Sequence, residues 1–381
     1  MTTPSAPHLL TVLHAAELTG PPLFALQFLR WLREEEPAWQ LSTLFLDGDG
    51  PISASFGELG PVTHADHRIP HRASRSVAGR AVAARRVRDL RRELGRQGPI
   101  ALSHVHCAGS FRAVAALPRG PVLGHLHELS VGLDLHLGPA ARDQIPAITR
   151  FVAVSDGVRS AFLERFDVRP DLVERQWGFV DPARLPGTTD RAALGLPPDK
   201  VIVTSSGVRH WRKAPELFVR VARRAREIAP EVPWQFVWIG GADRGGLEGL
   251  VAAAGLDDLV RFLPHQPDAL AWIAASDLFV LSAREDAFPL VCVEAAAAGC
   301  PIATFDNGGA AELVRAAGCG TVAPALDVEA LASQVAAAGR DQAERARWGD
   351  AGRRFARQHL LIEQAGPRLL ASLRSTLASP A

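Results

Sequence analysis

Two carboxylates, Asp286 and Glu294, flank a short apolar stretch and are well suited to bind a polyhydroxylated ligand. Asp286 lies in a polar loop after an apolar run, whereas Glu294 lies in an apolar segment that continues into four alanines. A carboxylate buried there needs hydrogen-bond donors, and the two hydroxyls of a ribose would provide them. The alternative is a glutamate on an exposed helix face, because charged residues are mostly exposed. The pattern favours a site for a nucleotide or a sugar.

Basic residues follow another apolar run, within residues 205–218. Arg212 and Lys213 stand just before a helix that we expect to begin near Pro215, where they would neutralise an anion. A diphosphate is best held by charge-assisted donors of this kind. We expect Lys213 to make the main contact, Arg212 the second and Arg209 the third. The alternative is a solvated basic loop, because charge runs are usually solvated.

A second anion-binding feature is the start of the helix expected over residues 290–298. Pro289 suits the first position of that helix because its missing N–H costs nothing there. The free N–H groups of a helix start favour phosphate. Gly20, between a strand and a helix near the N-terminus, would likewise let the backbone approach a ligand closely, although an ordinary turn is the alternative.

Four histidines stand in two pairs of equal spacing, at positions 104 and 106 and at positions 125 and 127. Residues two apart in a strand lie on the same face. Metal sites usually add a carboxylate or a cysteine at a defined spacing, which these pairs lack, so we expect no bound metal. For His127 the alternatives are a group that binds substrate and a packing group at a strand end.

These residues must be positioned by elements in which short apolar runs alternate with longer amphipathic segments, a pattern typical of βαβ units and parallel sheets. Strands are expected at residues 9–14, 41–46, 101–105, 122–126, 151–154, 201–205, 234–239, 260–262, 278–281 and 302–305. Helices are expected at residues 22–33, 75–95, 158–166, 214–228, 246–254, 269–275 and 290–298. We therefore predict an α/β fold of two Rossmann-like lobes whose parallel sheets face each other across a cleft.

A change of composition divides the chain. Residues 179–200 are rich in proline, glycine and charge, which predicts a linker over residues 181–200. The predicted domains are then residues 1–180 and residues 201–360, and we expect a helix around residues 360–381 to pack back on the first domain.

The composition is that of a globular protein of 381 residues, long enough for two domains. Lys and Arg total 42 against 41 Asp and Glu, and a net charge of +1 lacks the basic excess typical of nucleic-acid binders. No apolar run reaches the ~20 residues that span a bilayer, and the first residues lack the pattern of a secretory signal. With four scattered cysteines, we expect a cytoplasmic, reduced protein without nucleic-acid partners.

The motif from Asp286 to Glu294, with Phe288, Pro289 and Leu290 between them and AAAAGCPI after, resembles the E-x7-E motif of the family 4 glycosyltransferases. The stretch RKAPELF at residues 212–218 resembles the R-K-G-x-D-L-F segment of that family. The resemblance covers nearly the whole chain and is most specific over residues 201–322. It implies the GT-B fold and transfer of a sugar from a nucleoside-diphosphate-sugar donor to an acceptor hydroxyl, with retention of the anomeric configuration.

The resemblance also implies roles by position. Glu294 would bind the ribose and Asp286 the donor sugar, although Asp286 stands where the family commonly has Glu and Glu285 lies beside it. His127 would hydrogen-bond the sugar, with Glu128 orienting it, so the expected catalytic residues are His127, Lys213 and Asp286. The expected donor-binding residues are Gly20, Arg209, Arg212, Lys213, His265, Asp286, Phe288, Leu290, Val291 and Glu294.

The same resemblance implies no cofactor and no divalent metal, since Lys213 and Arg212 would neutralise the leaving group. The first domain would bind the acceptor: a small molecule, a glycan or a lipid-linked hydroxyl. Residues 68–96 contain ten arginines and two acidic residues. Three functions of this basic segment stay open: a solvated helix face, a site for an anionic acceptor, and peripheral contact of the helix at 75–96 with the inner face of a membrane. Two other functions stay open: a nucleotide-sugar-binding protein without turnover, and a sugar phosphorylase or synthase.

Overall fold

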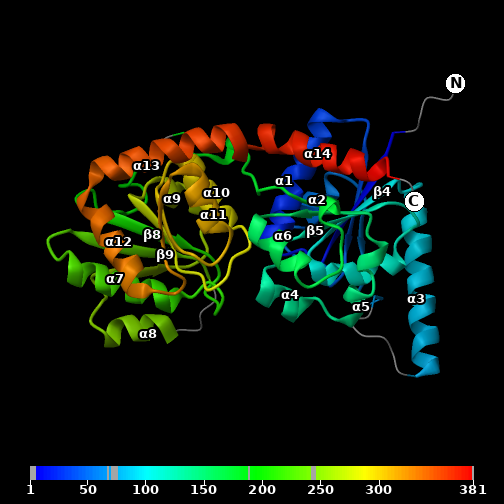
Figure 1. The fold of residues 1–381 in the computed structure, drawn as a ribbon, viewed down its shortest axis with the longest axis horizontal. Coiled ribbons are helices and arrows are strands. Elements are labelled where there is room, and N and C mark those ends of the chain that lie inside the picture. The colour runs from blue at the N-terminus through cyan, green and yellow to red at the C-terminus, as the bar shows by residue number, and fades with distance from the viewer. Residues whose placement is uncertain (1–5, 67, 70–75, 188, 242–245, 380–381) are drawn as a thin grey trace. The chain divides into compact units, whose positions relative to one another are not determined.

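The computed structural model describes residues 6–66, 68–69, 76–187, 189–241 and 246–379. The chain divides into two compact units (Figure 1). The first consists of Met1–Trp177 together with Ala365–Ala381, and the second of Gly178–Gln364. Each unit is built on its own parallel sheet, as the alternation of apolar and amphipathic segments predicts.

The first unit has a seven-stranded sheet in the order β3-β2-β1-β4-β5-β6-β7, and every strand pair in it is parallel. Its strands are β1 (His8–Leu13), β2 (Gln40–Phe45), β3 (Val62–His64), β4 (Leu102–His106), β5 (Val122–Leu126), β6 (Arg150–Ala153) and β7 (Val173–Arg175). Its α-helices are α1 (Gly20–Glu35), α2 (Ser53–Gly57), α3 (Val77–Gly95), α4 (Ser130–His136), α5 (Pro139–Arg142), α6 (Asp156–Leu163) and most of α14 (Ile362–Leu377). The strand order reverses between β1 and β4, which is where open α/β sheets bind ligands.

The second unit has a six-stranded parallel sheet in the order β10-β9-β8-β11-β12-β13. Its strands are β8 (Val201–Ser206), β9 (Trp234–Ile239), β10 (Val260–Leu263), β11 (Leu278–Leu281), β12 (Ile302–Phe305) and β13 (Gly320–Ala323). Its α-helices are α7 (Pro215–Ile228), α8 (Gly246–Ala253), α9 (Ala269–Ala274), α10 (Leu290–Ala298), α11 (Gly309–Ala317), α12 (Val328–Arg340) and α13 (Gln342–Phe355). The order reverses between β8 and β11, so the loops after these two strands meet at one edge of the sheet.

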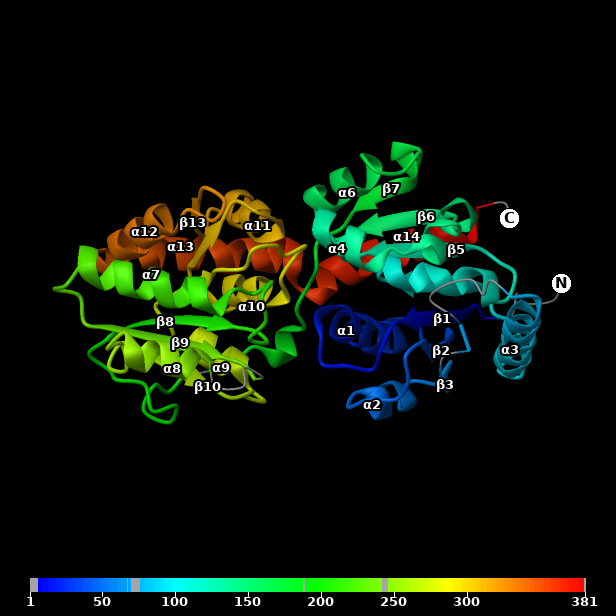
Figure 2. The ribbon, with the colours of Figure 1, turned by 90° about the horizontal axis from the view of Figure 1, so that it is seen from below.

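The core of the second unit explains why its strands are almost continuously apolar. Alternate residues of a strand face opposite sides of the sheet, and both sides are covered by helices. Val203 and Phe236 join the cluster under α7 and α12, which lie side by side in Figures 1 and 2. Ile202 and Val237, one residue away on the same strands, join the cluster under α9 on the opposite face.

The apolar patterns locate the long strands closely but miss the helices α11, α12 and α13. The strands expected at residues 122–126, 234–239, 278–281 and 302–305 form with those bounds. The patterns miss β3, β7 and β13, which contain only three or four residues each. A strand that short carries too few alternations to be distinguished from a loop.

The segment expected to be a linker, residues 181–200, belongs to the second unit. Leu196 is buried in the cluster with Ile202, and Arg191 donates to the carbonyl of Ala275 and pairs with Asp277 at 2.8 Å. Glycine and proline here mark turns of a packed segment, so composition alone does not identify an interdomain linker.

The C-terminal residues Ala365–Ala381 return to the first unit. Gln176 donates to the carbonyl of Ala365 at 2.8 Å, and Arg374 pairs with Glu36 at 2.5 Å. Gly366 lies so close to the indole of Trp31 that an added Cβ would overlap the ring. The last turns of the chain are therefore part of the first unit's packing.

The arginine-rich helix α3 is anchored only in its second half, where Leu90 and Leu94 are buried, while Ala81 and Ala84 are exposed. Asp89 pairs with Arg85 and Arg92, so part of the basic charge is neutralised locally. The arginines at positions 72 and 75 lie outside the described residues. Contact of α3 with a membrane stays a prediction, which co-sedimentation with anionic vesicles tests. In the part of the chain that the structure describes, no helix is both long and apolar enough to cross a bilayer.

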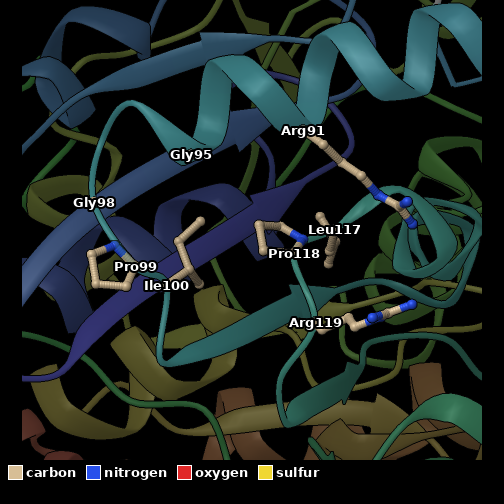
Figure 3. Close-up of a pocket in the computed structure, with 8 residues that line it drawn as sticks. All are labelled: Arg91, Gly95, Gly98, Pro99, Ile100, Leu117, Pro118 and Arg119. Carbon is tan, nitrogen blue, oxygen red and sulfur yellow. The ribbon is translucent and has the colours of Figure 1, made fainter.

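A cavity of about 390 Å³ opens between the end of α3 and the segments that lead into β4 and β5 (Figure 3). It is lined by glycine and apolar residues at positions 98–100 and 117–118, and Arg91 and Arg119 lie at one side of it. It lies at the amino ends of these strands. Ligands of open α/β sheets bind at the carboxyl ends, so we assign no substrate to this cavity.

Candidate active site

Lys213, Arg212 and Asp286 form an ion-paired cluster at the carboxyl edge of the second sheet. Lys213 Nζ lies 2.6 Å and Arg212 Nη1 3.3 Å from Asp286 Oδ2. The two cations come from the loop after β8, and the carboxylate from the loop after the neighbouring strand β11. Two positive charges against one negative charge leave the cluster with one positive charge in excess.

Burial and charge compete at Asp286, whose side chain is only 11% exposed. Burial disfavours the ionised form, but the charges of Lys213 and Arg212, and their hydrogen bonds, outweigh it and lower the pKa of Asp286. The carboxylate is therefore ionised at neutral pH and holds the lysine in a fixed position.

Backbone contacts tie the β8 and β11 loops to each other. Arg284 donates its backbone N–H to the carbonyl of Arg212 at 2.8 Å and its guanidinium to the carbonyl of Trp211 at 2.7 Å. The hydroxyl of Ser282 donates to the carbonyl of Ala214 at 3.1 Å. Asn307, just after β12, donates to the carbonyl of Arg284 at 3.0 Å. The sequence reading missed these residues, because they act on backbone atoms and carry no motif of their own.

Two glycines shape the β8 loop under Lys213. Gly207 has a φ of 151°, and a Cβ at this position would lie 3.4 Å from the Lys213 side chain. Gly240, with a φ of 145°, follows β9, and a Cβ there would overlap the carbonyl oxygen of Gly207. The indole of Trp238 donates to that oxygen at 3.0 Å. The close approach of two strand ends therefore requires glycine at position 240.

A third glycine, Gly309, begins α11 and fixes the backbone of Asp286. Its N–H donates to the carbonyl of Asp286 at 3.0 Å, and a Cβ would overlap the carbonyl oxygen of Ala287. The Phe288 ring lies against the same glycine and against Gly178. Phe288 is buried and packs the loop, and its contact with a donor stays a prediction.

The helix α10 begins beside this loop, with Pro289 as its N-cap. The N–H groups of Leu290 and Val291 belong to the first turn, which has no carbonyl partner within the helix. These groups and the partial positive charge of the helix start suit an anion. Leu290 and Val291 thus offer backbone donors, and their contact with a donor stays a prediction.

Glu294 on α10 is paired with a residue that the sequence reading placed in a linker. Arg184 Nη1 lies 3.1 Å from Glu294 Oε1, and the glutamate side chain is 12% exposed. Burial raises the pKa of Glu294, and the charge of Arg184 opposes that shift in part. Arg184 closes a turn over Pro182–Arg184 that the side chain of Asp181 caps. No sequence signal marks Arg184, because a single arginine in a proline-rich segment is common.

Two of the expected donor-binding residues, Arg209 and His265, are not part of the ion-paired cluster. Arg209 forms an ion pair with Glu248 on α8, and its guanidinium lies 5.3 Å from the centre of the Phe262 ring. His265 is exposed in the loop after β10, with its backbone N–H near Gly241. The Arg209 side chain therefore connects the loop after β8 to α8 and β10, and the donor-binding roles of Arg209 and His265 stay predictions.

The four histidines of the first unit gather at the carboxyl ends of β4 and β5. His104 Nε2 lies 3.1 Å from His125 Nδ1, and His106 Nδ1 lies 3.1 Å from His127 Nε2. The rings are stacked, with interplanar angles of 22–27° between the strands, and Phe24 of α1 packs edge-on against His125 and His127.

The geometry of this stack bears on metal binding. Ring nitrogens of His104, His106 and His125 lie within 4.8 Å of one another, a spacing that a metal ion could use. In this structure the rings are hydrogen-bonded in pairs, His104 to His125 and His106 to His127. That they bind no metal stays a prediction.

Glu128 acts on the backbone near the histidines. Its carboxylate accepts hydrogen bonds from the N–H groups of Ala108 and His127 at 3.0–3.1 Å. Burial raises the pKa of Glu128, although these hydrogen bonds oppose the shift. The expectation that Glu128 orients the His127 ring is corrected: the ring is held by His106, and the glutamate holds the turn. Gly20 begins α1 with open space where a Cβ would stand, so no protein contact requires a glycine there.

The fold and the second unit's site define a class. Two Rossmann-like units with parallel sheets are the GT-B fold of glycosyltransferases. Residues 187–355, most of the second unit, match the family model of glycosyl transferases group 1. That match, which covers less than half of the chain, contains the ion-paired cluster, both of its loops and Glu294.

Curated relatives are about 30% identical. A D-inositol 3-phosphate glycosyltransferase of Rhodococcus erythropolis is 32% identical over 217 residues, which are 51% of this chain and 49% of the relative. The enzyme of the same name from Saccharomonospora viridis is 30% identical over 200 residues, or 49% and 46%. The chain thus spans about half the length of the curated relatives it matches.

Solved structures agree over nearly the whole chain. Anabaena HepE in complex with UDP and glucose has a TM-score of 0.77 at 18% identity, covering 96% of this chain and 99% of HepE. Sucrose-phosphate synthase from Thermosynechococcus elongatus has a TM-score of 0.79 at 18% identity, covering 98% and 100%. At this identity the likeness establishes the fold and not the substrate.

Proposed function

We propose that this chain is a glycosyltransferase that moves a hexosyl group from a nucleoside-diphosphate-sugar to an acceptor hydroxyl with retention of the anomeric configuration, as in family 4. The observation that carries the proposal is the cluster of Lys213, Arg212 and Asp286 beside the start of α10. It lies in the part of the chain that matches glycosyl transferases group 1.

The cluster suits a diphosphate leaving group. Its excess positive charge and the first-turn N–H groups of α10 would face the negative charge that develops as the bond to the sugar breaks. Charge stabilisation of this kind is usually the largest catalytic contribution. Asp286 keeps the two cations in place beforehand, so little reorganisation is needed when the donor binds.

Glu294 is the proposed ribose ligand. It is buried on α10, one helix turn beyond the proposed phosphate donors, and its Oε1 is paired with Arg184. A ribose offers two hydroxyl donors, and a carboxylate accepts both. The charge of Arg184 opposes the rise that burial causes in the pKa of Glu294, and the carboxylate would be shared with the ribose on binding.

For the sugar transfer we propose attack on the same face that the diphosphate leaves. The acceptor oxygen forms a bond to the anomeric carbon as the bond to the diphosphate oxygen breaks, and a phosphate oxygen takes the acceptor proton. His127 would hydrogen-bond the donor sugar. This scheme needs no metal, because Lys213 and Arg212 supply the positive charge.

A binding experiment and a turnover experiment test the proposal. UDP is the first nucleotide to try, because the HepE structure holds UDP, and GDP and ADP serve as alternatives. A nucleotide at 100 times its Kd adds about 2.7 kcal/mol of stability, which a melting curve detects. UDP-sugars with D-inositol 3-phosphate, the acceptor for which the relatives are named, should then release UDP.

The outcomes separate the alternatives. Nucleotide binding without nucleotide release over a panel of acceptors would indicate a binding protein, and consumption of inorganic phosphate would indicate a phosphorylase. Inversion in the proton NMR spectrum of the product would contradict retention. We expect full activity in EDTA, and loss of activity there would contradict the metal-free scheme.

A further inference from the structure

The histidine pair formed by His106 and His127 differs from the pair formed by His104 and His125 in that one of its rings is partly exposed. His106 is 1% exposed and its Nε2 has no hydrogen-bond partner, whereas His127 is partly exposed. The two rings meet through His106 Nδ1 and His127 Nε2 at 3.1 Å. One proton lies between these nitrogens, and its position decides which nitrogen of His127 is free to act.

Two arrangements satisfy the bond between two neutral imidazoles, since each carries one N–H. If His127 Nε2 carried the shared proton, His106 would have to carry its own on Nε2, which is buried without a partner. If His106 Nδ1 carries the shared proton, the buried Nε2 of His106 has no hydrogen and is only an acceptor without a donor. Buried N–H groups without a partner are rarer than buried acceptors without one. The second arrangement is therefore favoured.

The pair His104 and His125 has no such choice. His104 Nδ1 and His125 Nε2 are both buried without a partner, so one of them holds an unsatisfied N–H in either arrangement. The pair of His106 and His127 can avoid a buried, unsatisfied N–H because His127 is partly exposed, so its second N–H need not be buried. The two pairs are stacked on each other, which keeps the four rings in register.

Charged forms do not disturb this arrangement near neutral pH. The groups around the pair are His104 and His125 from the stack, His14 from the end of β1, and Glu128 below the turn. Burial lowers the pKa of His127 to about 3 and that of His106 well below its usual value, and the neighbouring histidines lower both further. Both rings are therefore neutral.

We propose that His106 is a positioning residue that fixes the tautomer of His127, so that His127 accepts through Nε2 and presents Nδ1–H as a hydrogen-bond donor. The inference rests on the proposed function in assigning His127 to the donor sugar. It deepens that function, because a histidine whose Nε2 lone pair is already used donates to a sugar oxygen and does not abstract the acceptor proton.

The tautomer can be measured without activity. In protein labelled with ¹⁵N-histidine, the ring nitrogen shifts of His127, assigned by their loss in His127→Gln, distinguish a protonated Nδ1 from a protonated Nε2. We expect Nδ1 to be protonated at about pH 7. A protonated Nε2 in the unaltered protein would overturn the proposal, whether or not any variant folds.

Two matched variants separate positioning from packing. His106→Leu removes the donor to His127, and His104→Leu removes a ring of the same strand that packs against His106 but leaves the hydrogen bond between His106 and His127 in place. We expect His106→Leu to make His127 a mixture of tautomers and to lower kcat on the order of tenfold with little change in the Kd for UDP. His104→Leu should leave the tautomer unchanged.

Equal effects of the two variants on the tautomer would contradict the proposal and indicate packing alone. Failure of the proposed function would appear differently: the tautomer would be as expected, but no nucleotide-sugar would be turned over. An unchanged kcat in His106→Leu together with a changed tautomer would show that His127 does not donate to the substrate, and would overturn the catalytic part.

Discussion

Lys213 Nζ lies 2.6 Å from Asp286 Oδ2, although the two residues are 73 positions apart in the chain. They meet because β8 and β11 are neighbours at the point where the strand order of the second sheet reverses. Each residue is nearly buried, with 16% and 11% of its side chain exposed. Replacing either one therefore leaves the other with an incompletely balanced charge.

Lys213→Ala tests the proposed stabilisation of the leaving group. The lost charge matters more as negative charge builds up on the diphosphate, so kcat should fall on the order of 10²–10³-fold, with a smaller loss of UDP affinity. Steady-state kinetics beside a melting curve measures both. Lys213→Arg should restore activity only in part, because a planar guanidinium does not reproduce a compact ammonium. A raised KM with an unchanged kcat would remove Lys213 from the catalytic step.

Glu294→Gln tests the ribose site. The amide has one acceptor where the carboxylate has two, so one ribose hydroxyl loses its partner, and UDP should bind more weakly by about 1.5–3 kcal/mol. Titration calorimetry measures the difference. Adding Arg184→Gln to this variant is the control: if affinity returns, the loss came from the released arginine and not from the ribose contact.

Gly309→Ala should damage the site through sterics alone. The new methyl group would overlap the carbonyl oxygen of Ala287 in the loop that holds Asp286, and we expect a loss of about 1–3 kcal/mol in the free energy of unfolding. Gly20→Ala is the matched control, because Gly20 also begins a helix but has open space around its Cβ position. Equal stability of the two variants in urea unfolding would show that the loop adapts.

Acid should destabilise the first unit through its histidine stack. Burial lowers the pKa of His104 and His127 to about 3, while the same rings in the unfolded chain take up protons near pH 6.5. Stability is therefore complete above about pH 6.5 and falls as the pH drops from there toward about 3. Each such histidine removes about 1.4 kcal/mol per pH unit in that window.

Urea unfolding of the whole chain at about pH 7, 6 and 5 measures this dependence. His104→Phe should reduce the slope, because it removes one ring that is protonated only on unfolding. An equal slope in the unaltered protein and in His104→Phe would mean that His104 does not take up a proton on unfolding, and would contradict the prediction.

The parallel α/β architecture and the long strands were predictable from the sequence, because buried parallel strands are continuous apolar runs that local periodicity reports. The sequence placed Lys213 and Asp286 after strands of the same lobe, but it did not predict the ion pair between them. Arg184, Asn307 and Gly309 could not be found in this way. Their contacts are to backbone atoms or to residues far along the chain, and no local pattern records such partners.

The direction of one side chain could not be predicted. Glu128 accepts hydrogen bonds from backbone N–H groups of a turn and not from the ring of His127. Its residue type and its place beside His127 suited the expected role. Direction depends on packing that forms only in the folded chain.

The return of Ala365–Ala381 to the first unit has a consequence for biosynthesis. Gln176 finds its carbonyl partner 189 residues later, and the indole of Trp31 packs against Gly366. Domains generally fold in order as the chain is translated, yet here the first unit receives most of α14 only after the whole second unit has been made. The amino-terminal half should therefore stay sensitive to proteases until the second unit has been synthesised.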